Sequence, residues 1–514
     1  MKHLLAMFLC LCLLLCGCAA EEPYVPTGDG LSTEGDIIDP VKPETDENKQ
    51  PQTLSLAYYK TQPMNPYQCN DFTNRALLTL VYQGLFFVDR NYTAEPILCR
   101  SFTVTADQKT YTFYLEQATF SDGTQVTADD VVASLSAAQS SNFYSGRFLH
   151  FKSVSKTEDG GIVISLATPV ENLPLLLDIP IVPAMQVSSD RPLGTGPYAL
   201  TATGSGDALI KRDNWWCSPN DLPITANTIK LFPAESANHI RDQFEFEDLS
   251  LACVDPGSDR YADYRCDYEL WDCENGIFLY LATSKDSTVF QNDGLRAALT
   301  YAIDRNLLVE NYYRDFARAA SLPASPLFPY YNQNLAERYA YAPEKFAEAV
   351  SKSGMSGYNV VLLVNSDDSL RLRVARRIGQ MLTEGGLNVT MKELRTSAYT
   401  RALKNREYDI YLGQTRLSPT MDLTPFFSTY GDLSWGGVND IGAYNLSLQA
   451  IENHGNYFSL HKMVMDNGLL CPVLFRSYAI YSTRGVFSDL NPSRDNVFHY
   501  TLGKTTEQIR TTLQ

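Results

Sequence analysis

Few of the residues that can do chemistry stand in a pattern that an enzyme would use. Ser153 and Lys156 fit the Ser-x-x-Lys pattern, in which a lysine accompanies a serine nucleophile. The sequence contains neither of the usual partner motifs, Ser-Asp-Asn and Lys-Thr-Gly, and it also lacks His-Glu-x-x-His, Gly-x-Ser-x-Gly and a phosphate-cradling glycine loop. We therefore interpret the match as chance and expect a protein that is not an enzyme.

Histidines and cysteines do not stand at metal-binding spacing either. No Cys-x-x-Cys pair occurs, and no histidine accompanies a cysteine at the spacing of a zinc site. His461, beside Lys462, is interpreted as a solvated residue on the surface of a helix. We expect neither a metal nor a cofactor.

The first residues resemble the start of an exported bacterial lipoprotein. Lys2 supplies positive charge, and residues 4–15 are almost wholly apolar. This run is shorter than the roughly 20 residues that span the hydrocarbon layer of a membrane, so it indicates a signal peptide. It ends in Leu-Cys-Gly-Cys, which resembles a lipobox, and we expect residues 1–17 to be removed and Cys18 to carry lipid.

Residues 18–50 differ in composition from the rest of the chain. Residues 19–50 hold nine Asp or Glu against two Lys, with several Pro and Gly and almost no apolar clustering. Such a segment buries too little apolar surface to offset its ordering entropy, and its charge keeps it extended. We expect a disordered acidic tether between the lipid and a folded body.

Eleven cysteines divide into two groups. Four belong to the N-terminal segment, and seven lie in the body: Cys69, Cys99, Cys217, Cys253, Cys266, Cys273 and Cys471. An odd number leaves at least one thiol unpaired in a monomer. Because export permits disulfides, free thiols and a disulfide both remain open, with Cys266 and Cys273, or Cys253 with either of them, as the nearest candidates.

From about Gln52 the composition is that of a globular protein, rich in Tyr and Phe. The remaining length of about 460 residues exceeds what a single core supports, so two or three lobes are expected. The formal charge of −17 argues against a nucleic-acid partner. No later run is long and apolar enough to predict a transmembrane helix.

Residues 120–135 form the most informative segment. Asp122-Gly123 is a turn pair, because glycine takes positive φ without a Cβ penalty. Thr127 stands where a helix N-cap is expected, and two aspartates follow in the first turn, near the positive end of the helix dipole. The apolar residues after them recur at helical spacing. The segment predicts a strand, a tight turn and a capped helix.

The amino-acid sequence of this segment resembles that of the family 5 extracellular solute-binding proteins, the oligopeptide-, dipeptide- and nickel-binding group that feeds ABC importers. Further matches follow in the family's order: an Asn-Pro loop at 62–66, Tyr-Gln-Gly-Leu at 82–85, a Pro-x-Leu element at 95–98, a Tyr-Thr-Phe-x-Leu strand at 109–115, Gly-Thr-Gly-Pro-Tyr at 194–198, and helices at 295–305 and from 341–345 onward. Each match alone is weak, but their collinear order at the expected spacing is specific.

The resemblance implies a mixed α/β fold of the two-lobed type II periplasmic-binding-protein kind (cluster C), with an inserted extra domain. Domain I would comprise residues 51–66, 190–276 and 470–514, domain II residues 67–189, and domain III residues 277–469. Two short apolar runs, residues 277–281 and 471–475, would be the crossover strands on which the lobes rock. Ordinary core strands would show the same pattern.

The resemblance also indicates where a ligand would bind. In peptide-binding relatives a domain III strand ends in Gly-Trp-x-x-Asp, and that carboxylate holds the ligand's ammonium group. The Trp and Asp positions are filled here by Gln414 and Leu417, so this anchor is missing. Arg416 would suit a carboxylate or another anion, with a structural salt bridge as the equal alternative. Asp422 would be a displaced anchor or, in the favoured interpretation, the cap of the helix that follows.

Four further residues are ligand-binding candidates. Trp435 lies in a loop between small residues, where an indole can wall a pocket or simply pack. The resemblance adds Gln62 and Asn65 in the first loop, and Tyr82.

The expected function is that of a lipid-anchored substrate-binding protein of an ABC importer, which captures a peptide-like ligand by hinge closure and delivers it to a permease and ATPase complex. We expect a monomer in the bacterial cell envelope, on the outer face of the cytoplasmic membrane or in the periplasm. The alternatives are another small solute, such as a metal chelate, an organic acid or a sugar, and a surface receptor for a signalling peptide that acts without transport.

Overall fold

The computed structural model describes residues 52–513 except 205, 220–221, 258–262, 436–438 and 488–489. The expected signal peptide, Cys18 and the acidic tether lie outside these residues. The chain divides into two units, Met1–Lys49 and Gln50–Gln514, and the second is the body described below. The described part of the chain contains no helix with the length and apolar character needed to cross a membrane.

One long mixed sheet runs through the body, in the order β15-β14-β16-β12-β17-β11-β1-β10-β9-β8, with β13 paired to β17. Its strands are β1 (Thr53–Tyr58), β8 (Tyr198–Thr203), β9 (Gly206–Lys211), β10 (Thr228–Pro233), β11 (Leu251–Val254), β12 (Glu269–Thr283), β13 (Ala317–Ala319), β14 (Asn359–Asn365), β15 (Asn388–Leu394), β16 (Ile410–Arg416) and β17 (Cys471–Ser482). β1 runs parallel to β10 and β11, and β14 runs parallel to β15 and β16.

Two smaller sheets complete the strands. One has the order β18-β4-β5-β7-β6 and the other pairs β2 with β3. Their strands are β2 (Phe86–Val88), β3 (Ala94–Pro96), β4 (Cys99–Thr105), β5 (Thr110–Leu115), β6 (Phe151–Lys156), β7 (Ile162–Leu166) and β18 (Arg510–Leu513). The strand predicted at residues 109–115 is confirmed as β5.

Helices pack on the sheets. Around β14 they cover both faces of the strand, and both faces are apolar. The α-helices are α2 (Phe72–Val81), α3 (Ala128–Gln139), α4 (Ala237–Glu245), α5 (Asp293–Ala298), α6 (Arg305–Tyr313), α7 (Gln333–Glu337), α8 (Pro343–Lys352), α9 (Ser369–Glu384), α10 (Thr396–Asn405), α11 (Thr424–Phe427), α12 (Ile441–Glu452), α13 (Tyr457–Asp466) and α14 (Thr506–Ile509). Successive side chains of a strand point to opposite faces. Leu362 therefore joins the core that contains α9, whereas Leu363 joins the core that contains α10. The mixed α/β class is confirmed.

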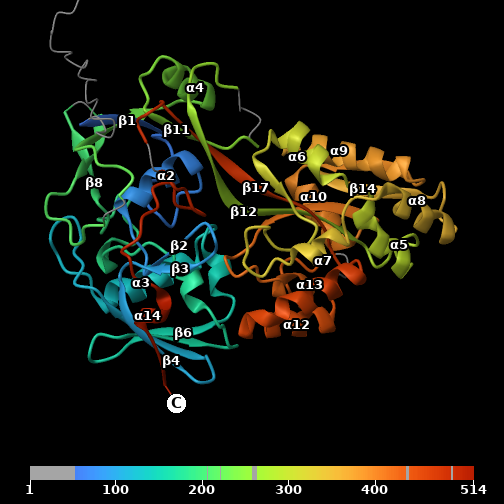
Figure 1. Cartoon of the computed structure of the whole chain (residues 1–514), viewed down its shortest axis with the longest axis horizontal. Coiled ribbons are helices and arrows are strands. Elements are labelled where there is room, and N and C mark those ends of the chain that lie inside the picture. Colours follow the sequence, from blue (N-terminus) through green and yellow to red (C-terminus); the bar gives the residue numbers. More distant parts are fainter. Residues whose placement is uncertain are drawn as a thin grey trace, which may run out of the picture. The chain divides into compact units, whose positions relative to one another are not determined.

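β12 and β17 lie side by side and connect two parts of the long sheet (Figure 1). At one end β17 also pairs with β11, and at the other end β12 also pairs with β16. The pairing of β12 with β17 is irregular between Glu274 and Phe278, where Gly276 has a φ of 69°. The predicted crossover segments, residues 277–281 and 471–475, lie in these two strands, and their role as hinges stays a prediction.

The turn and the cap predicted within residues 120–135 are confirmed. Gly123 has a φ of 89°, and α3 begins directly after Thr127, its N-cap. The Thr127 backbone N–H and hydroxyl donate to Asp130 Oδ2 over 2.8 and 2.7 Å. The strand expected before the turn is wrong, because only an isolated bridge joins Thr119 to Gln125.

The helix predicted at residues 295–305 is interrupted. α5 continues as a 3-10 turn to Ala302 and stops there. Asp304 is the N-cap of α6, and its carboxylate accepts a hydrogen bond from the Leu307 backbone N–H over 3.1 Å. A side chain that caps a new helix favours a break, since the capping residue itself is not helical.

Gly-Thr-Gly-Pro-Tyr at 194–198 is a site of close backbone approach. A Cβ on Gly194 would collide with the carbonyl oxygen of Val81, the last residue of α2, and one on Gly196 would meet the Leu80 carbonyl. The Gly196 N–H donates to the Val81 carbonyl over 2.9 Å. Glycine is needed here because no other residue lets the loop lie this close to the end of the helix.

The structure also answers two expectations about the cysteines and about His461. The seven cysteines of the body are free thiols, so the disulfide alternative is not realised among them. The interpretation of His461 as a surface residue is wrong, because its side chain is fully buried on α13.

Candidate ligand-binding site

A cleft of about 590 Å³ separates two segments that are far apart in the sequence. Residues 142–168 form one wall, and residues 415–448 form the other. The first wall belongs to the expected domain II and the second to the expected domain III. The volume falls in the range of pockets that hold small ligands.

Arg147 lies in the first wall and is 3% exposed. Its Nε and Nη2 donate to the two carboxylate oxygens of Asp178, each over 2.6 Å. Burial alone would lower the pKa of this guanidinium, but the carboxylates of Asp178 and Asp495 raise it above the usual value. Arg147 is therefore a permanent cation on the wall of the cleft.

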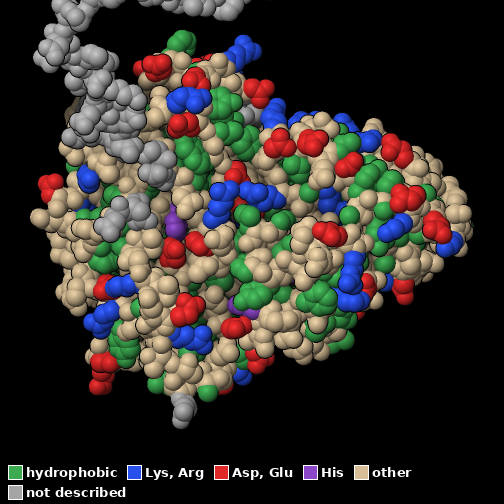
Figure 2. Space-filling model, in the orientation of Figure 1, with side chains coloured by type: hydrophobic (Ala, Val, Ile, Leu, Met, Phe, Trp, Pro, Cys, Tyr) green, Lys and Arg blue, Asp and Glu red, His purple; other side chains and the backbone are tan. Residues whose placement is uncertain are grey.

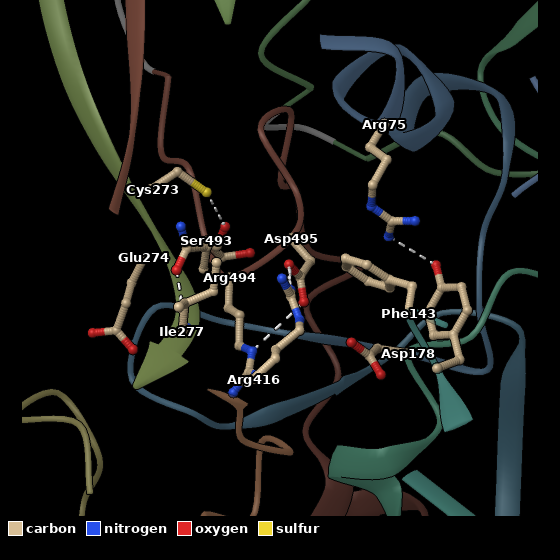
Figure 3. Close-up of polar contacts among 12 residues, drawn as sticks. Arg75, Phe143, Asp178, Cys273, Glu274, Ile277, Arg416, Ser493, Arg494 and Asp495 are labelled. Carbon is tan, nitrogen blue, oxygen red and sulfur yellow. Dashed lines mark hydrogen bonds and ion pairs between the residues drawn. The ribbon is translucent and has the colours of Figure 1, made fainter. Parts of the chain in front are cut away.

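Asp495 lies among the guanidinium groups of Arg147, Arg416 and Arg494, and Figure 3 shows it beside Arg416 and Arg494. Arg416 Nη2 donates to its Oδ1, while Arg147 Nη2 and Arg494 Nε each lie 3.5 Å from Oδ2. Burial alone would raise the pKa of this carboxyl, but the three cations hold it well below its usual range. Asp495 is thus ionised at any physiological pH.

Arg416 is the last residue of β16, and its backbone pairs with Ile277 of β12. Its guanidinium carbon lies 4.0 Å from the centre of the Phe143 ring, a cation–π contact across the cleft. Arg416 makes a salt bridge to Asp495 and also lines the cleft, so its role toward a ligand stays a prediction.

Asp422 faces the opposite wall. His150 Nε2 lies 2.8 Å from Asp422 Oδ2, and its Nδ1 lies 2.6 Å from the Thr168 hydroxyl. Asp422 Oδ1 accepts from the Thr424 N–H over 2.8 Å, but the N-cap of α11 is Leu423. Asp422 therefore precedes the N-cap by one position, yet its carboxylate binds the first N–H of α11 and also contacts the opposite wall. Its role as a ligand anchor stays a prediction.

The other predicted site residues are not among those that line this cleft. Gln62 is exposed, and Asn65 is buried with its amide donating to the Val187 and Ser189 carbonyls. Tyr82 donates to the Pro192 carbonyl over 2.9 Å and borders a second, smaller cavity. Trp435 packs against the core that contains α10 to α13.

Sequence reasoning missed most of the residues that surround Arg416 and Asp422. These are Phe143, Arg147, His150, Arg494 and Asp495. The composition around residues 491–496, with Asn, Pro and Ser, indicates a turn, but no spacing in the sequence connects that turn to β16.

The mouth of the cleft carries apolar side chains. Leu149 on one wall is 50% exposed and Tyr430 on the other is 94% exposed, and both line the cleft. A charged base beneath an apolar rim suits a ligand with ionised groups and an apolar part.

The residues that could bind a metal or act as a nucleophile are placed as follows. Among the described residues, no group of three or more His, Cys, Asp or Glu could hold a metal ion. Ser153 and Lys156 are exposed on β6, three positions apart, so they point to opposite faces of the strand. Lys156 pairs with Asp129 over 2.6 Å instead.

Comparison with known proteins gives consistent results. The family model described as bacterial extracellular solute-binding proteins, family 5 Middle, matches residues 93–437. The glutathione-binding protein GsiB of Escherichia coli O6:K15:H31 (strain 536 / UPEC) is 25% identical over 388 residues, which cover 72% of this chain and 74% of GsiB.

Solved structures share the fold. The substrate-binding protein CtaP of an ABC transporter from Listeria monocytogenes has a TM-score of 0.70 at 18% identity and covers 88% of this chain and 98% of its own. The oligopeptide-binding protein AppA of Bacillus subtilis, solved with a nonapeptide, has a TM-score of 0.61 at 17% identity and covers 89% of this chain and 100% of its own. The predicted type II periplasmic-binding-protein fold is confirmed.

Proposed function

The chain belongs to family 5 of the bacterial extracellular solute-binding proteins of ABC importers, and on this basis we propose that it captures a peptide-like ligand and delivers it to a membrane permease and its ATPase. The relatives are solute-binding proteins rather than enzymes. The observation that carries the proposal is the cleft between residues 142–168 and 415–448, with ionised groups at its base and apolar side chains at its mouth.

Capture would proceed by closure of the two walls on the ligand. β12 and β17 connect the parts of the sheet that would move, and Gly276 interrupts their pairing at the expected crossover. His150 and Asp422 would hold the closed walls together, as would the Glu171 carboxylate, which accepts from the His454 backbone N–H over 2.7 Å. In this proposal, residues 67–189 and 277–469 move as domains II and III relative to each other.

A peptide suits the chemistry of the walls. Peptide ligands offer main-chain hydrogen-bonding groups that a binding protein can use whatever their side chains are. Their terminal charges would meet Arg416 and Asp422, and an apolar side chain would contact Leu149 and Tyr430. Glutathione, which names the relative GsiB, is the first peptide to test.

The proposed setting follows from the N-terminal residues. Lipid on Cys18 and the acidic segment after it would hold a monomeric body at the cell envelope, on the outer face of the cytoplasmic membrane or in the periplasm. The anchor would keep the captured ligand close to the permease.

A test begins with the Cys18→Ala chain, purified without lipid. Native mass spectrometry should show a bound peptide-like molecule, and titration calorimetry with glutathione and a panel of di- to pentapeptides should identify the preferred class. Saturating ligand should raise the melting temperature, because it binds only the folded protein.

Two results would contradict this function. Stabilisation by sugars or metal chelates alone, across the same panel, would exclude peptides as the ligand. Hydrolysis of a bound peptide that disappears in the Ser153→Ala variant would indicate an enzyme. A small organic acid is the second candidate, and it is favoured by the two arginines of the cleft, Arg147 and Arg416.

A further inference from the structure

Asp495 stands at the tip of a tight turn in a strained conformation. Ser493 and Asn496 close the turn, with the Ser493 N–H donating to the Asn496 carbonyl over 2.9 Å and the reverse bond measuring 3.2 Å. Asp495 has a φ of 64°, in the left-handed region that costs a residue with a Cβ free energy. Such strain persists where the surroundings hold it and is found at functional sites. The turn therefore fixes the position of the Asp495 carboxylate.

The surroundings hold more positive than negative charge. The arginine cluster, defined as Arg75, Arg147, Arg416 and Arg494, contains four guanidinium groups, whereas its neighbouring carboxylates are Asp178 and Asp495. Glu274 lies within electrostatic reach of Arg494, and its carboxylate is bonded to the Tyr92 and Ser325 hydroxyls. Among these named residues the guanidinium groups outnumber the carboxylates by four to three.

This excess lies inside an acidic protein. The chain has a formal charge of −17, and acidic and basic side chains are interspersed over the face in Figure 2. Burying a charge costs free energy unless an opposite charge is buried beside it. The cluster is thus suited to receive one more negative charge.

Several donors of the cluster lack an acceptor. Among the described residues, Arg416 Nε and Arg494 Nη1 are buried without a hydrogen-bond partner, and Arg494 Nε makes only an ion pair, over 3.5 Å, with Asp495 Oδ2. Buried polar groups are nearly always paired, so each exception needs an explanation. An acidic group from outside the chain would supply acceptors for these guanidinium groups.

Asp495 pairs with two residues that line the ligand cleft, Arg147 and Arg416. It also borders a second cavity of about 50 Å³, together with Arg75, Asp178 and Asn496. Within the described residues, Arg75 takes part in no ion pair and Asn496 has no partner for its side-chain amide. The small cavity therefore offers Asp495 both space and a cation to turn toward.

We propose that the ligand carries an acidic group that takes the place of Asp495 on Arg147 and Arg416, while the Asp495 side chain turns into the small cavity toward Arg75. Asp495 is then an internal carboxylate that keeps Arg416 paired until an acid arrives, and it also lies beside Arg147. A neutral ligand could not make the exchange, because it would leave Arg416 without a counter-ion, whereas Arg147 keeps Asp178. This inference rests on the proposed function and adds a ligand class, an acid, and a specificity-determining residue, Asp495.

The first experiment removes the Asp495 carboxylate from the protein and supplies acetate in solution instead. Asp495→Gly, in the Cys18→Ala chain, removes the side chain, and glycine accepts the positive φ without strain. Added acetate should raise the melting temperature of this variant in a concentration-dependent way, whereas the neutral isostere acetamide should not. The chain with Asp495 intact should show no acetate effect beyond that of sodium chloride at equal ionic strength.

A matched control lies outside the cleft. Asp207 accepts two hydrogen bonds from Arg191, over 2.8 and 2.7 Å, at a partly exposed site. Asp207→Gly should gain nothing from acetate, since solvent already reaches that pair. Equal effects of acetate and acetamide on Asp495→Gly, or an equal acetate effect on Asp207→Gly, would overturn the proposal.

The second experiment uses peptides as probes, each as the free acid and as the C-terminal amide. Peptides should bind as acids and lose affinity as amides, and Asp495→Gly should bind the acids about tenfold more tightly, since no internal competitor has to be displaced. Equal binding of acid and amide would refute the exchange. If no peptide binds at all, the proposed peptide ligand fails, and the acetate result alone decides whether the acid subsite exists.

Discussion

Arg416 and Asp422 lie six residues apart, and their partners come from elsewhere in the chain. Arg416 bonds to Asp495, 79 residues away, and Asp422 lies against His150, 272 residues away. The type of each side chain indicates that it can bind an opposite charge. Which charge it meets, and whether water is present, depends on chain segments that the local sequence does not specify.

His461 shows the effect of burial on one residue most directly. It belongs to α13, its side chain is buried in the protein, and neither ring nitrogen has a hydrogen-bond partner among the described residues. Burial lowers its pKa from 6.5 to about 3, because the interior disfavours the charged imidazolium. The folded protein therefore binds fewer protons at this site than the unfolded chain between those two pH values.

The first prediction concerns the pH dependence of stability. A histidine with a lowered pKa contributes stability that is present above its unfolded pKa and is lost as the pH falls through the window from about 6.5 to about 3. Between pH 7 and pH 5 the loss from this site should be about 2 kcal/mol. His461→Leu should remove that part of the loss, as measured by urea unfolding at both pH values.

A matched variant isolates the effect of burial. His239 on α4 is partly exposed, so His239→Leu makes the same substitution outside the buried core and serves as the comparison. If the free energies of unfolding of the His461→Leu variant and the parent chain fall equally between pH 7 and pH 5, His461 is not a buried neutral residue.

At the scale of elements, short motifs act through the contacts that they allow. The Thr127 cap fixes the start of α3 through bonds that span three residues. The glycines of 194–198 act differently, because their absent side chains let the loop touch the end of α2. A cap can be recognised from adjacent residues, whereas the partner of a close-approach glycine cannot.

The second prediction tests this close approach. Gly194→Ala should lower the free energy of unfolding by about 3 kcal/mol, because the new Cβ meets a backbone carbonyl that cannot rotate away. Thermal or urea unfolding measures the loss.

Gly146→Ala is the control, since its Cβ would have nothing within 4 Å and its φ is not positive. That variant should keep the stability of the parent chain within about 0.5 kcal/mol. Similar stabilities for the two variants would mean that the loop does not need glycine at 194.

At the scale of the whole molecule, the two long strands β12 and β17 contribute to more than one core. Cys273 of β12 lies in the core that contains α2 and α3, whereas Leu279 and Leu281 lie in the core that contains α9. The arginine cluster lies where these strands are irregular, and a side chain on Gly276 would collide with Arg494. Ligand charge and lobe movement are thus coupled at one place in the proposed mechanism.

The third prediction concerns the attachment of the molecule to a membrane. In cells that process lipoproteins, the unaltered chain should fractionate with membranes, because two or three acyl chains give stable anchoring. Cys18→Ala should move it to the fraction without membranes, as seen by immunoblot.

The neighbouring cysteine supplies the comparison. Cys16 lies before the expected cleavage position, so Cys16→Ala should leave the chain with the membranes. Identical fractionation of the two variants would show that Cys18 is not the anchor.

The family and much of the local structure could be predicted from the amino-acid sequence. The β5 strand, the Gly123 turn and the Thr127 cap depend on residues within a few positions of one another, and such short-range preferences are legible in a sequence. The error at residues 295–305 has the same origin, since the capping role of Asp304 was overlooked in a helical pattern.

The candidate site was decided by the tertiary structure. Arg416 and Asp422 could be named from their chemistry, but Gln62, Asn65 and Trp435 are not among the residues that line the cleft, and Arg147, His150 and Asp495 went unrecognised. The strength of a charge pair depends on distance and on exclusion of water, and both are fixed only when distant segments pack together. The sequence by itself therefore determined the family and its local elements, whereas packing determined which charges face the ligand.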